Sequence, residues 1–294
     1  MSTVDIMLPY YGDVGLMKLA VQSVMWQTDQ DWRLTVIDDG YPDESVAPWF
    51  AALGDHRVRY LRNEHNLGAN GNYRKCLTLV EHELAVIMGA DDVMLPNYVD
   101  WLRRADAAFP QADIFQPGVV VVDERGAAAN GLVERAKRFY APGGTGMRTL
   151  TGEALAVSVL RGDWLYFPSL AWRSGRMLST GFREHLDVVQ DLALVLDIAK
   201  AGGTLVVDDE VVFHYRRHSA SDSSWRALEG TRFEEEHRFL LDVAGEMRDL
   251  GWRRAARVAR LHVSSRGNAA TVLVRAALAR NWKGVASLAR RVAT

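Results

Sequence analysis

The 294-residue sequence is poor in cysteine and in long apolar runs. Its single cysteine, Cys76, excludes an intramolecular disulfide and is typical of a reducing compartment. No window of about 18 uncharged apolar residues occurs, so we expect no membrane-spanning helix. The N-terminus also lacks the basic flank and apolar stretch of a signal peptide. We therefore expect a cytoplasmic protein, with the inner face of the membrane as the alternative location.

The sequence also lacks a surplus of charge, because 35 Lys and Arg face 37 Asp and Glu. This balance argues against an electrostatic grip on nucleic acid, and no nucleic-acid partner is expected. The charges are unevenly placed, since residues 251–294 hold ten basic and no acidic residues and leave the rest with a formal charge of -12. Such a basic end predicts a solvated helical face docked on the body, peripheral contact with an anionic membrane, or self-association.

Short apolar runs alternate with amphipathic stretches in the first part of the chain. The runs at 4–9, 34–37, 58–61 and 84–88 predict strands, and the stretches at 14–26, 70–80 and 96–109 predict helices. Strands separated by helices imply βαβ units and hence an α/β fold with a mostly parallel sheet. Ligands of such sheets bind at the carboxyl ends of the strands.

The remaining chain is less regular. Residues 123–150 hold several glycines and a proline, which predict a long flexible connection that covers the substrate. Beyond it we expect helices at 151–160 and 189–201, a strand at 205–213 and helices from Trp225 onward.

Acidic pairs follow two of the predicted strands. Asp38 and Asp39 follow the second strand, and Asp91 and Asp92 follow the fourth. Neighbouring side chains at a strand end point in different directions, so one carboxylate can bind a metal while the other faces a sugar hydroxyl. Carboxylates that only favour the dipole of the next helix are equally compatible with this placement.

Several short motifs occur in a characteristic order. They are LPYY at 8–11, VIDDG at 36–40, NLG at 66–68, GNYRKCL at 71–77 and MGADD at 88–92. This order resembles family 2 glycosyltransferases of the GT-A fold, and the resemblance spans residues 4–218. It implies a Rossmann-like, mostly parallel sheet flanked by helices, here with a C-terminal helical extension.

The resemblance also implies a division of the chain into three parts. Residues 1–122 would form the half that binds the nucleotide sugar. Residues 123–224 would form the acceptor-binding and catalytic half of the same GT-A domain. Residues 225–294 would be the basic helical extension.

The resemblance assigns the donor site residue by residue. The nucleotide contacts are expected at Pro9, Tyr11, Asp39, Asn72, Lys75 and Asp91. Asp92 is the expected ligand of a divalent cation, Mn²⁺ or Mg²⁺. The chain departs from the family pattern at Tyr10-Tyr11-Gly12, where Thr-Tyr-Asn is frequent, and at Gly89, where an acidic residue is frequent.

Two later segments resemble the catalytic motifs of the family. In VVQDLAL at 188–194, Gln190 stands where Glu is common and Asp191 stands at the position of the general base. Such a base is needed because a hydroxyl that attacks an anomeric carbon loses its proton as the bond forms. The alternative is that the carboxylate of Asp191 only stabilises the N-terminus of its helix.

The segment FHYRRHSAS at 213–221 resembles the Tyr-Arg-x-His-x-x-Ser segment that closes many of these domains. It makes His218 a candidate metal ligand or diphosphate contact, and Arg216 or Arg217 a partner for phosphate. Trp172 lies where relatives form the acceptor site, and its ring would stack on a sugar or serve as a core residue.

The leading hypothesis is thus a metal-dependent inverting glycosyltransferase of the hexosyl type (EC 2.4). It would move a sugar from a UDP, dTDP or GDP donor to a hydroxyl of a glycan, a lipid-linked acceptor or a small glycoside. A non-catalytic sugar-nucleotide-binding or scaffold protein is the alternative, kept open by Gly89 and Gln190. A nucleotidyltransferase would need a basic, Gly-rich loop after the first strand, and a dehydrogenase would need Gly-x-Gly-x-x-Gly there. Neither pattern occurs.

Overall fold

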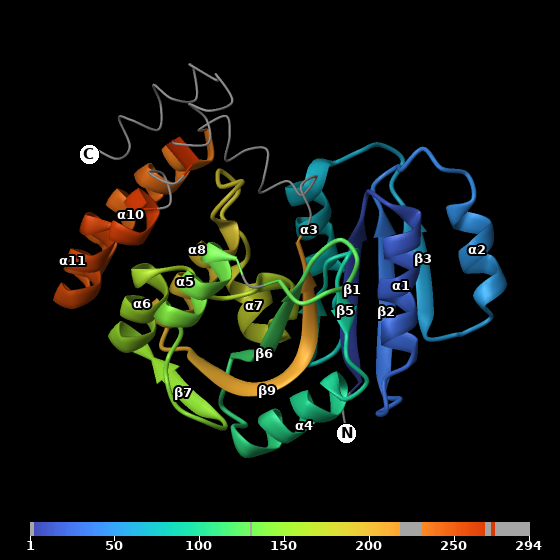
Figure 1. Ribbon diagram of the computed structural model, residues 1–294, viewed down its shortest axis with the longest axis horizontal. Coiled ribbons are helices and arrows are strands. Elements are labelled where there is room, and N and C mark those ends of the chain that lie inside the picture. The colour runs from blue at the N-terminus through green and yellow to red at the C-terminus, as the bar shows by residue number, and fades with distance from the viewer. Residues whose placement is uncertain (1–2, 130, 218–230, 268–271, 274–294) are drawn as a thin grey trace.

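The computed structural model describes residues 3–129, 131–217, 231–267 and 272–273. A single mixed sheet runs through the molecule with helices on both faces (Figure 1). Its strands are β1 (Val4–Tyr10), β2 (Trp32–Asp38), β3 (Val58–Arg62), β4 (Leu84–Ile87), β5 (Val93–Met94), β6 (Ile114–Val122), β7 (Arg148–Thr151), β8 (Ala171–Arg173) and β9 (Thr204–Arg216).

The helices follow the strands in the chain. They are α1 (Val14–Met25), α2 (Val46–Leu53), α3 (Gly68–Thr78), α4 (Tyr98–Ala108), α5 (Leu132–Tyr140), α6 (Gly152–Arg161), the 3₁₀ turn η1 (Phe167–Ser169), α7 (Ser174–Thr180), α8 (Gln190–Lys200), α10 (Thr231–Asp249) and α11 (Arg253–Leu261). The strands and helices expected from 4 to 109 are present within a few residues of their expected bounds.

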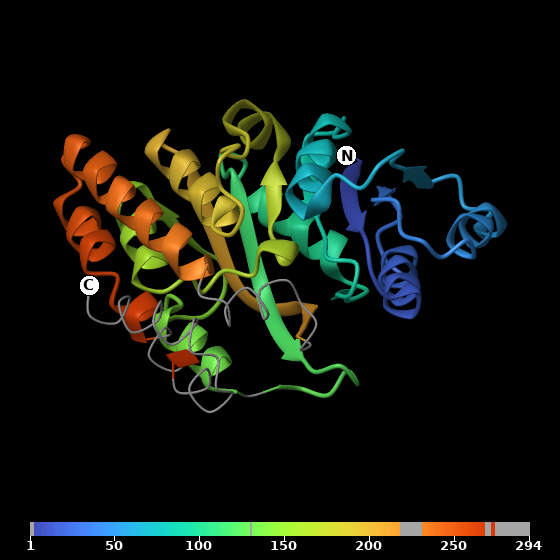
Figure 2. The ribbon, with the colours of Figure 1, turned by 90° about the horizontal axis from the view of Figure 1, so that it is seen from above.

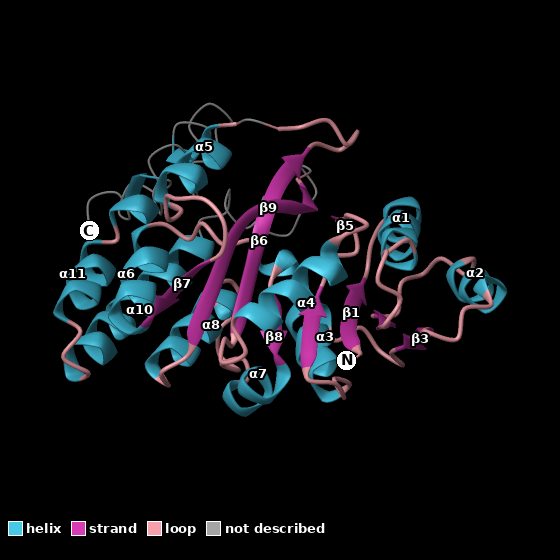
Figure 3. Ribbon diagram, turned by 90° about the horizontal axis from the view of Figure 1, so that it is seen from below, coloured by secondary structure: helices cyan, strands magenta, loops and turns pink. Residues whose placement is uncertain are grey.

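The sheet has the order β3-β2-β1-β4-β8-β6-β9-β5, and β7 also pairs with β9. β1, β2, β3 and β4 run parallel, as does the pair of β6 and β9. β8 lies antiparallel between β4 and β6, and β5 and β7 pair antiparallel with β9. The expectation of a mostly parallel, GT-A-like sheet is therefore confirmed. The sequence pattern did not reveal β6 or the short strands β5, β7 and β8 (Figure 3).

Alternating side chains of the strands build two cores. Ile6 and Leu8 of β1 pack under α1 and α4, whereas Met7 faces the other side, with Cys76 of α3 and the helices α6 and α8. A strand buried on both faces must be apolar at every position, which explains the uninterrupted apolar run in β4. Cys76 is a buried packing residue, and burial raises the pKa of its thiol.

The segment 123–150 corrects one expectation, because it contains α5 and β7 rather than an unstructured connection. The glycines that suggested a loop lie around these elements. Gly131 precedes α5, and Gly144 and Gly146 adopt positive φ angles in the turn that leads into β7. β7 then pairs with β9 from Arg148 to Thr151, so this segment is part of the sheet.

The helical extension is docked on the body. Glu153 of α6 accepts hydrogen bonds from the backbone N–H groups of Arg254 (2.6 Å) and Ala255 (3.2 Å) at the start of α11. Views from two directions place α10 and α11 at the end of the molecule opposite α2 and β3 (Figure 2). Among the described residues, no helix is both long enough and apolar enough to cross a membrane.

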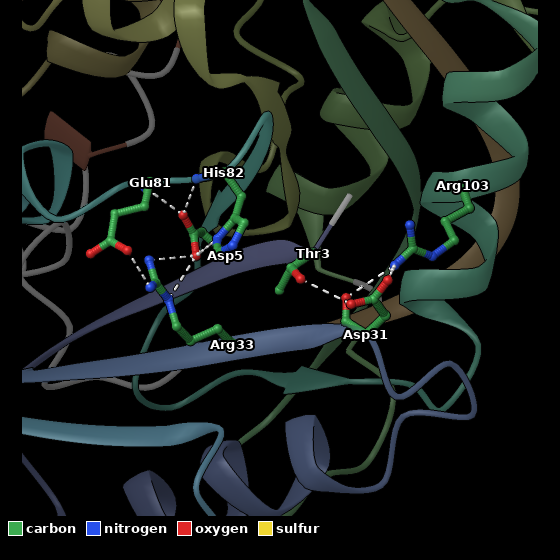
Figure 4. A network of polar contacts seen from close by, with 7 residues as sticks. All are labelled: Thr3, Asp5, Asp31, Arg33, Glu81, His82 and Arg103. Carbon is green, nitrogen blue, oxygen red and sulfur yellow. Dashed lines mark hydrogen bonds and ion pairs between the residues drawn. The ribbon is translucent and has the colours of Figure 1, made fainter. Parts of the chain in front are cut away.

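The amino end of the sheet is held together by a buried carboxylate. Asp5 of β1 accepts hydrogen bonds from the backbone N–H groups of Glu81 (2.6 Å) and His82 (2.7 Å) and from Nε of Arg33 (3.0 Å), as Figure 4 shows. These contacts join β1 to β2 and to the turn before β4. Asp5 therefore serves the fold, and the candidate site lies at the opposite ends of the strands.

Candidate functional site

The two aspartates after β2 have different surroundings. Asp38 accepts a hydrogen bond from Nη1 of Arg62 at 2.8 Å and is fully buried. Oδ1 of Asp39 points away from this pair and accepts from Nδ2 of Asn63 (2.7 Å) and the backbone N–H of Leu67 (2.8 Å). Asp38 thus belongs to the core of the sheet, whereas Asp39 orders the loop that leads into α3.

Asn63 is the centre of this arrangement. Its Oδ1 accepts from Nζ of Lys75 at 2.6 Å, and its Nδ2 also lies 3.2 Å from Oδ1 of Asn72. Three expected nucleotide contacts, Asp39, Asn72 and Lys75, are therefore brought together by a residue that the sequence analysis missed. Asn72 itself is buried and its Nδ2 donates to the carbonyl of Ile37 (2.8 Å), so it also joins the network to β2. The available signal was positional, since Asn63 follows β3 directly.

The end of β1 lies beside this network. The backbone N–H of Asp39 donates to the carbonyl of Tyr10 at 2.9 Å, which places Pro9 and Tyr11 next to the end of β2. The ring of Tyr11 is 58% exposed and meets the ring of Tyr41 edge to face, with centroids 5.3 Å apart. An exposed aromatic ring next to a buried carboxylate is an arrangement that suits a planar base with hydrogen-bonding edges.

Asp92, after β4, is a buried carboxylate with one oxygen unmatched. Its Oδ1 accepts from the backbone N–H of Arg216 at 2.8 Å, but its Oδ2 is buried without a hydrogen-bond partner among the described residues. Burial, and then the neighbouring charge of Asp91, raise the pKa of Asp92 well above its usual range. His218, the second expected ligand, lies outside the described residues, which contain no group of three His, Cys, Asp or Glu suited to a metal.

Gly89 leaves the space that Asp92 occupies. A Cβ at position 89 would lie 2.4 Å from Oδ2 of Asp92 and 3.1 Å from Oδ1 of Asp91. Any side chain there would displace the carboxylate from its place. The departure from the family pattern at Gly89 is therefore matched to the packing of this acidic pair.

Arg216 fixes the turn that carries the acidic pair. Its Nε donates to the carbonyl of Asp91 (2.8 Å) and its Nη1 to the carbonyl of Asp123 (3.0 Å), and the residue is buried. Arg217 forms an ion pair with Glu134 of α5 at 2.7 Å. Arg216 thus joins β9 to the ends of β4 and β6, and Arg217 joins β9 to α5. A phosphate contact of one of these arginines stays a prediction.

Two tyrosines lie near the acidic pair. The pKa of Tyr73 on α3 and that of Tyr215 on β9 are both raised by burial, and the charge of Asp92 contributes to both. The ring of Tyr166 lies 5.2 Å from that of Tyr215, with Nζ of Lys137 4.4 Å from its centroid. No role was expected for these tyrosines, although Tyr73 lies within the motif GNYRKCL.

Gln190 and Asp191 open α8 and are linked to α3. Nδ2 of Asn70 donates to Oδ1 (2.6 Å) and to the carbonyl (3.0 Å) of Asp187, so its Oδ1 must face Gln190, whose Nε2 donates to it at 2.7 Å. This chain of donors fixes both amides and leaves Oε1 of Gln190 buried without a partner. Asp191 is partly buried and directly follows Gln190, which Asn70 holds. Helix α3 therefore connects the network of Asp39 with the start of α8.

Known proteins share both this sequence pattern and this fold. Residues 5–138, from β1 into α5, match the model of the family Glycosyl transferase family 2. The amino-terminal part of the chain is thus similar to glycosyl transferase family 2. Among solved structures, the chain is similar to S. aureus TarS 1–349 in complex with UDP-GlcNAc, with a TM-score of 0.63 at 12% identity, over 82% of this chain and 66% of that chain. This likeness shows that the chain has a GT-A-like fold.

Curated relatives match a shorter part of the chain. It is 29% identical over 99 residues to the UDP-Glc:alpha-D-GlcNAc-diphosphoundecaprenol beta-1,3-glucosyltransferase WfgD of Escherichia coli, covering 33% of this chain and 38% of WfgD. It is 27% identical over 95 residues to the putative colanic acid biosynthesis glycosyl transferase WcaA of Escherichia coli strain K12, covering 32% of this chain and 34% of WcaA. The matches thus span about a third of the length of these relatives.

One expected contact does not reach the surface. Trp172 on β8 is fully buried, and its ring packs 6.0 Å from that of Phe167 in the core. A fully buried side chain cannot stack on a sugar. The acceptor role expected for Trp172 is therefore corrected to a packing role, and the partly buried Tyr73 and Tyr215 are the aromatic side chains near the acidic pair.

Proposed function

We propose that this protein is an inverting glycosyltransferase of the hexosyl type, which transfers a sugar from a nucleoside diphosphate donor to a hydroxyl acceptor. The single observation that carries this proposal is the buried, unmatched Oδ2 of Asp92 at the end of β4. A buried carboxylate oxygen without a donor is unfavourable, and a bound cation would compensate it. That strand end is where α/β sheets bind their ligands.

The donor would lie across the ends of β1, β2 and β4. Tyr11 and Pro9 flank the base, Asp39 faces its hydrogen-bonding edge, and Lys75 supports the loop of Asp39 through Asn63. Asp91 would contact the sugar or ribose. A UDP sugar is the first candidate, because the TarS structure holds UDP-GlcNAc and WfgD is named for UDP-Glc, with dTDP and GDP sugars as further candidates.

The acidic pair fits a divalent cation such as Mn²⁺ or Mg²⁺. Oδ2 of Asp92 is an unmatched hard oxygen, Asp91 adds a second carboxylate, and Mg²⁺ is commonly held by one or two carboxylates together with substrate phosphates. His218 is proposed to complete the site. When bound, such a cation stabilises the negative charge of the leaving diphosphate.

The remaining chemistry falls to side chains of the protein. Asp191 is proposed as the general base, whose carboxylate takes the proton of the acceptor hydroxyl as that oxygen attacks the anomeric carbon. Direct attack from the face opposite the leaving group inverts this carbon and needs no covalent intermediate. The rings of Tyr73, Tyr166 and Tyr215 would exclude water from the reacting centre and give the acceptor sugar a flat surface.

The test is thermal stabilisation by a panel of nucleoside diphosphates and nucleotide sugars, each with and without Mn²⁺. A ligand that binds only the folded state raises the melting temperature according to its concentration over Kd. We expect a metal-dependent rise for one base, lost in Asp92→Asn and kept in Asp208→Asn, because both oxygens of the buried Asp208 already have donors. Absence of stabilisation by every nucleotide would refute the donor site and favour a scaffold protein.

The basic extension is proposed to contact an anionic membrane surface. Arg253, Arg254, Arg257 and Arg260 of α11 are exposed and make no ion pair with another described residue. At about 100° per residue they fall within one third of the helix circumference, and the exposed Leu261 falls among them. Arginines around an apolar side chain suit phospholipid headgroups, and this would bring the site to a lipid-linked acceptor.

Flotation with vesicles tests this surface. Binding to phosphatidylglycerol vesicles is expected to be weakened about tenfold or more by Arg257→Glu, because each arginine near such a surface contributes about 1 kcal/mol. Arg59→Glu, at an exposed position of β3, is the matched control and is expected to bind like the wild type. Equal binding to neutral phosphatidylcholine vesicles, or no binding, would refute the membrane contact and leave self-association to be examined by sedimentation.

A further inference from the structure

A carboxylate of the C-terminal extension reaches the loop that precedes Asp191. Oε1 of Glu235, on α10, accepts hydrogen bonds from three consecutive backbone N–H groups, those of Asp187 (3.0 Å), Val188 (2.6 Å) and Val189 (3.3 Å). Val189 is the residue before α8, and Asp191 is the second residue of that helix. One oxygen atom therefore holds the whole approach to the proposed general base.

This contact has a clear physical basis. Val189 is the N-cap residue of α8, and Asp187 and Val188 precede the helix, so none of the three N–H groups has a partner within it. A negative charge at this end of the helix is favoured by the helix dipole. Hydrogen bonds from N–H groups to a carboxylate are shorter and stronger than those to a neutral acceptor. Three of them on one oxygen fix the backbone from Asp187 to Val189 more firmly than a neutral loop contact would.

The same loop is held from the opposite side by α3. Nδ2 of Asn70 binds the carbonyl and the carboxylate of Asp187, and Oδ1 of Asn70 accepts from Gln190. Asp191 thus follows a segment fixed between a helix of the nucleotide-binding half and a helix of the extension. A proposed base that must meet an acceptor hydroxyl within hydrogen-bond distance requires such a fixed backbone.

Glu235 is not needed to dock α10. Glu246, eleven residues later on the same helix, binds Nη1 (3.1 Å) and Nη2 (3.0 Å) of Arg183. Phe239, Leu240 and Val243 of α10 are buried in the core between the two. Docking therefore rests on an ion pair and apolar packing, while Glu235 is directed at backbone N–H groups of one particular loop.

We infer that Glu235 is a positioning residue of the active site, which orders residues 187–189 so that Asp191 is correctly placed. The inference rests on the proposed role of Asp191. It makes the extension a part of the catalytic unit, since α10 supplies a group without which the loop of the base is less ordered.

The experiment compares Glu235→Ala and Glu235→Gln with Glu246→Gln in the full chain. With the nucleotide sugar that stabilises the wild type, we expect Glu235→Ala to lower kcat for nucleoside diphosphate release about tenfold with the donor KM unchanged, because small misplacements of a catalytic group cost this much or more. Glu235→Gln keeps an oxygen acceptor and should retain most of kcat. Glu246→Gln loosens α10 elsewhere and should keep the kcat of the wild type.

Amide hydrogen exchange of the same variants separates the two proposals. Glu235→Ala should speed exchange at residues 187–189, and Glu246→Gln should leave it unchanged. Unchanged exchange in Glu235→Ala, or an equal loss of kcat in Glu246→Gln, overturns the inference. A wild type that turns over no donor refutes the proposed function instead, while faster exchange at 187–189 still shows that Glu235 orders the loop.

Discussion

The strand ends beyond β2 and β4 lie on either side of β1, and each carries a buried aspartate, yet the two sites differ. Oδ1 of Asp39 has two donors, Asn63 and the backbone of Leu67. Oδ2 of Asp92 has none among the described residues, and the pKa of Asp92 is raised by its burial and by Asp91. A carboxylate oxygen that already has donors can order a loop, whereas a buried one without donors can bind a cation. The protein itself supplies the donors at the first site, and a ligand would be needed at the second.

Among the predictions from this comparison, we expect the largest effect on activity when Asp92 is replaced by a neutral residue. Asp92→Asn keeps an oxygen for the N–H of Arg216 but removes the anion, so we expect kcat/KM to fall about a thousandfold, the range seen when a main electrostatic contact of a transition state is lost. The same change should leave the stability of the metal-free protein within about 1 kcal/mol of the wild type, because the raised pKa of Asp92 already disfavours its charged form.

Urea unfolding and turnover assays on the same samples measure both effects. Asp208→Asn is the control, because Trp101 and the backbone of Asp209 already satisfy that buried carboxylate. This variant should lose stability and keep activity. A fall in both quantities for Asp92→Asn would mean that Asp92 stabilises the fold and holds no cation.

We expect Asn63→Ala to disrupt the hydrogen-bond network of Asp39. This change removes donors or acceptors from Asp39, Asn72 and Lys75 together, and each buried polar group left unmatched costs about 1–3 kcal/mol. We expect a loss of about 2–3 kcal/mol in unfolding free energy and weaker stabilisation by nucleotides. Asn97→Ala, which breaks one contact to Glu210 away from the site, should show a small loss and unchanged nucleotide binding. Equal losses in the two variants would contradict the central place of Asn63.

Much of the fold was accessible from the sequence because parallel strands are buried on both faces. The apolar runs of β1 and β4 leave no other interpretation in an α/β chain, and their order carried the resemblance to the family. The antiparallel β8 and β7 were missed because a short strand has no period of its own. Residues 123–150 were misinterpreted because glycines at the borders of α5 and β7 were taken as evidence against any element.

The sequence predicted which residues lie at the strand ends of the candidate site. It did not predict which residues form hydrogen bonds with them. Asp39 and Asp92 follow predicted strands, so the topology placed them. Asn63 and Glu235 act through contacts between segments distant in the chain, 24 residues from Asp39 in the first case and 48 from Asp187 in the second. Burial of Trp172 likewise follows from the position of β8 inside the sheet, which no local pattern encodes.

Gln190 offers a further test with a smaller expected effect. Like Oδ2 of Asp92, its Oε1 is buried without a hydrogen-bond partner among the described residues, but it belongs to a neutral amide. In Gln190→Glu the carboxylate meets Oδ1 of Asn70, which cannot turn without facing the carboxylate of Asp187. We expect kcat to fall about tenfold, or about 1.4 kcal/mol, although Glu is common here in the family this chain resembles. Gln190→Ala loses one hydrogen bond without adding charge and should be less impaired in steady-state kinetics. A more active Gln190→Glu would show that Asn70 adapts.

The smallest effect is expected in acid unfolding. It concerns a third kind of carboxylate, which is partly buried beside Arg and Lys side chains. Burial raises the pKa of Asp197 and that of Glu246, but hydrogen bonds from Arg183 and Lys200 outweigh it and hold both below their usual range. Groups with a depressed pKa in the folded state stabilise it above the unfolded pKa, and this contribution is lost as pH falls through the folded value. Glu246→Gln should therefore be less stable than the wild type by about 1 kcal/mol at pH 7, with the difference vanishing between about pH 5 and pH 2. A difference in urea unfolding free energy that stays constant over this range would show that Glu246 acts through packing and not through its charge, and would confine the electrostatic contrast to the strand ends.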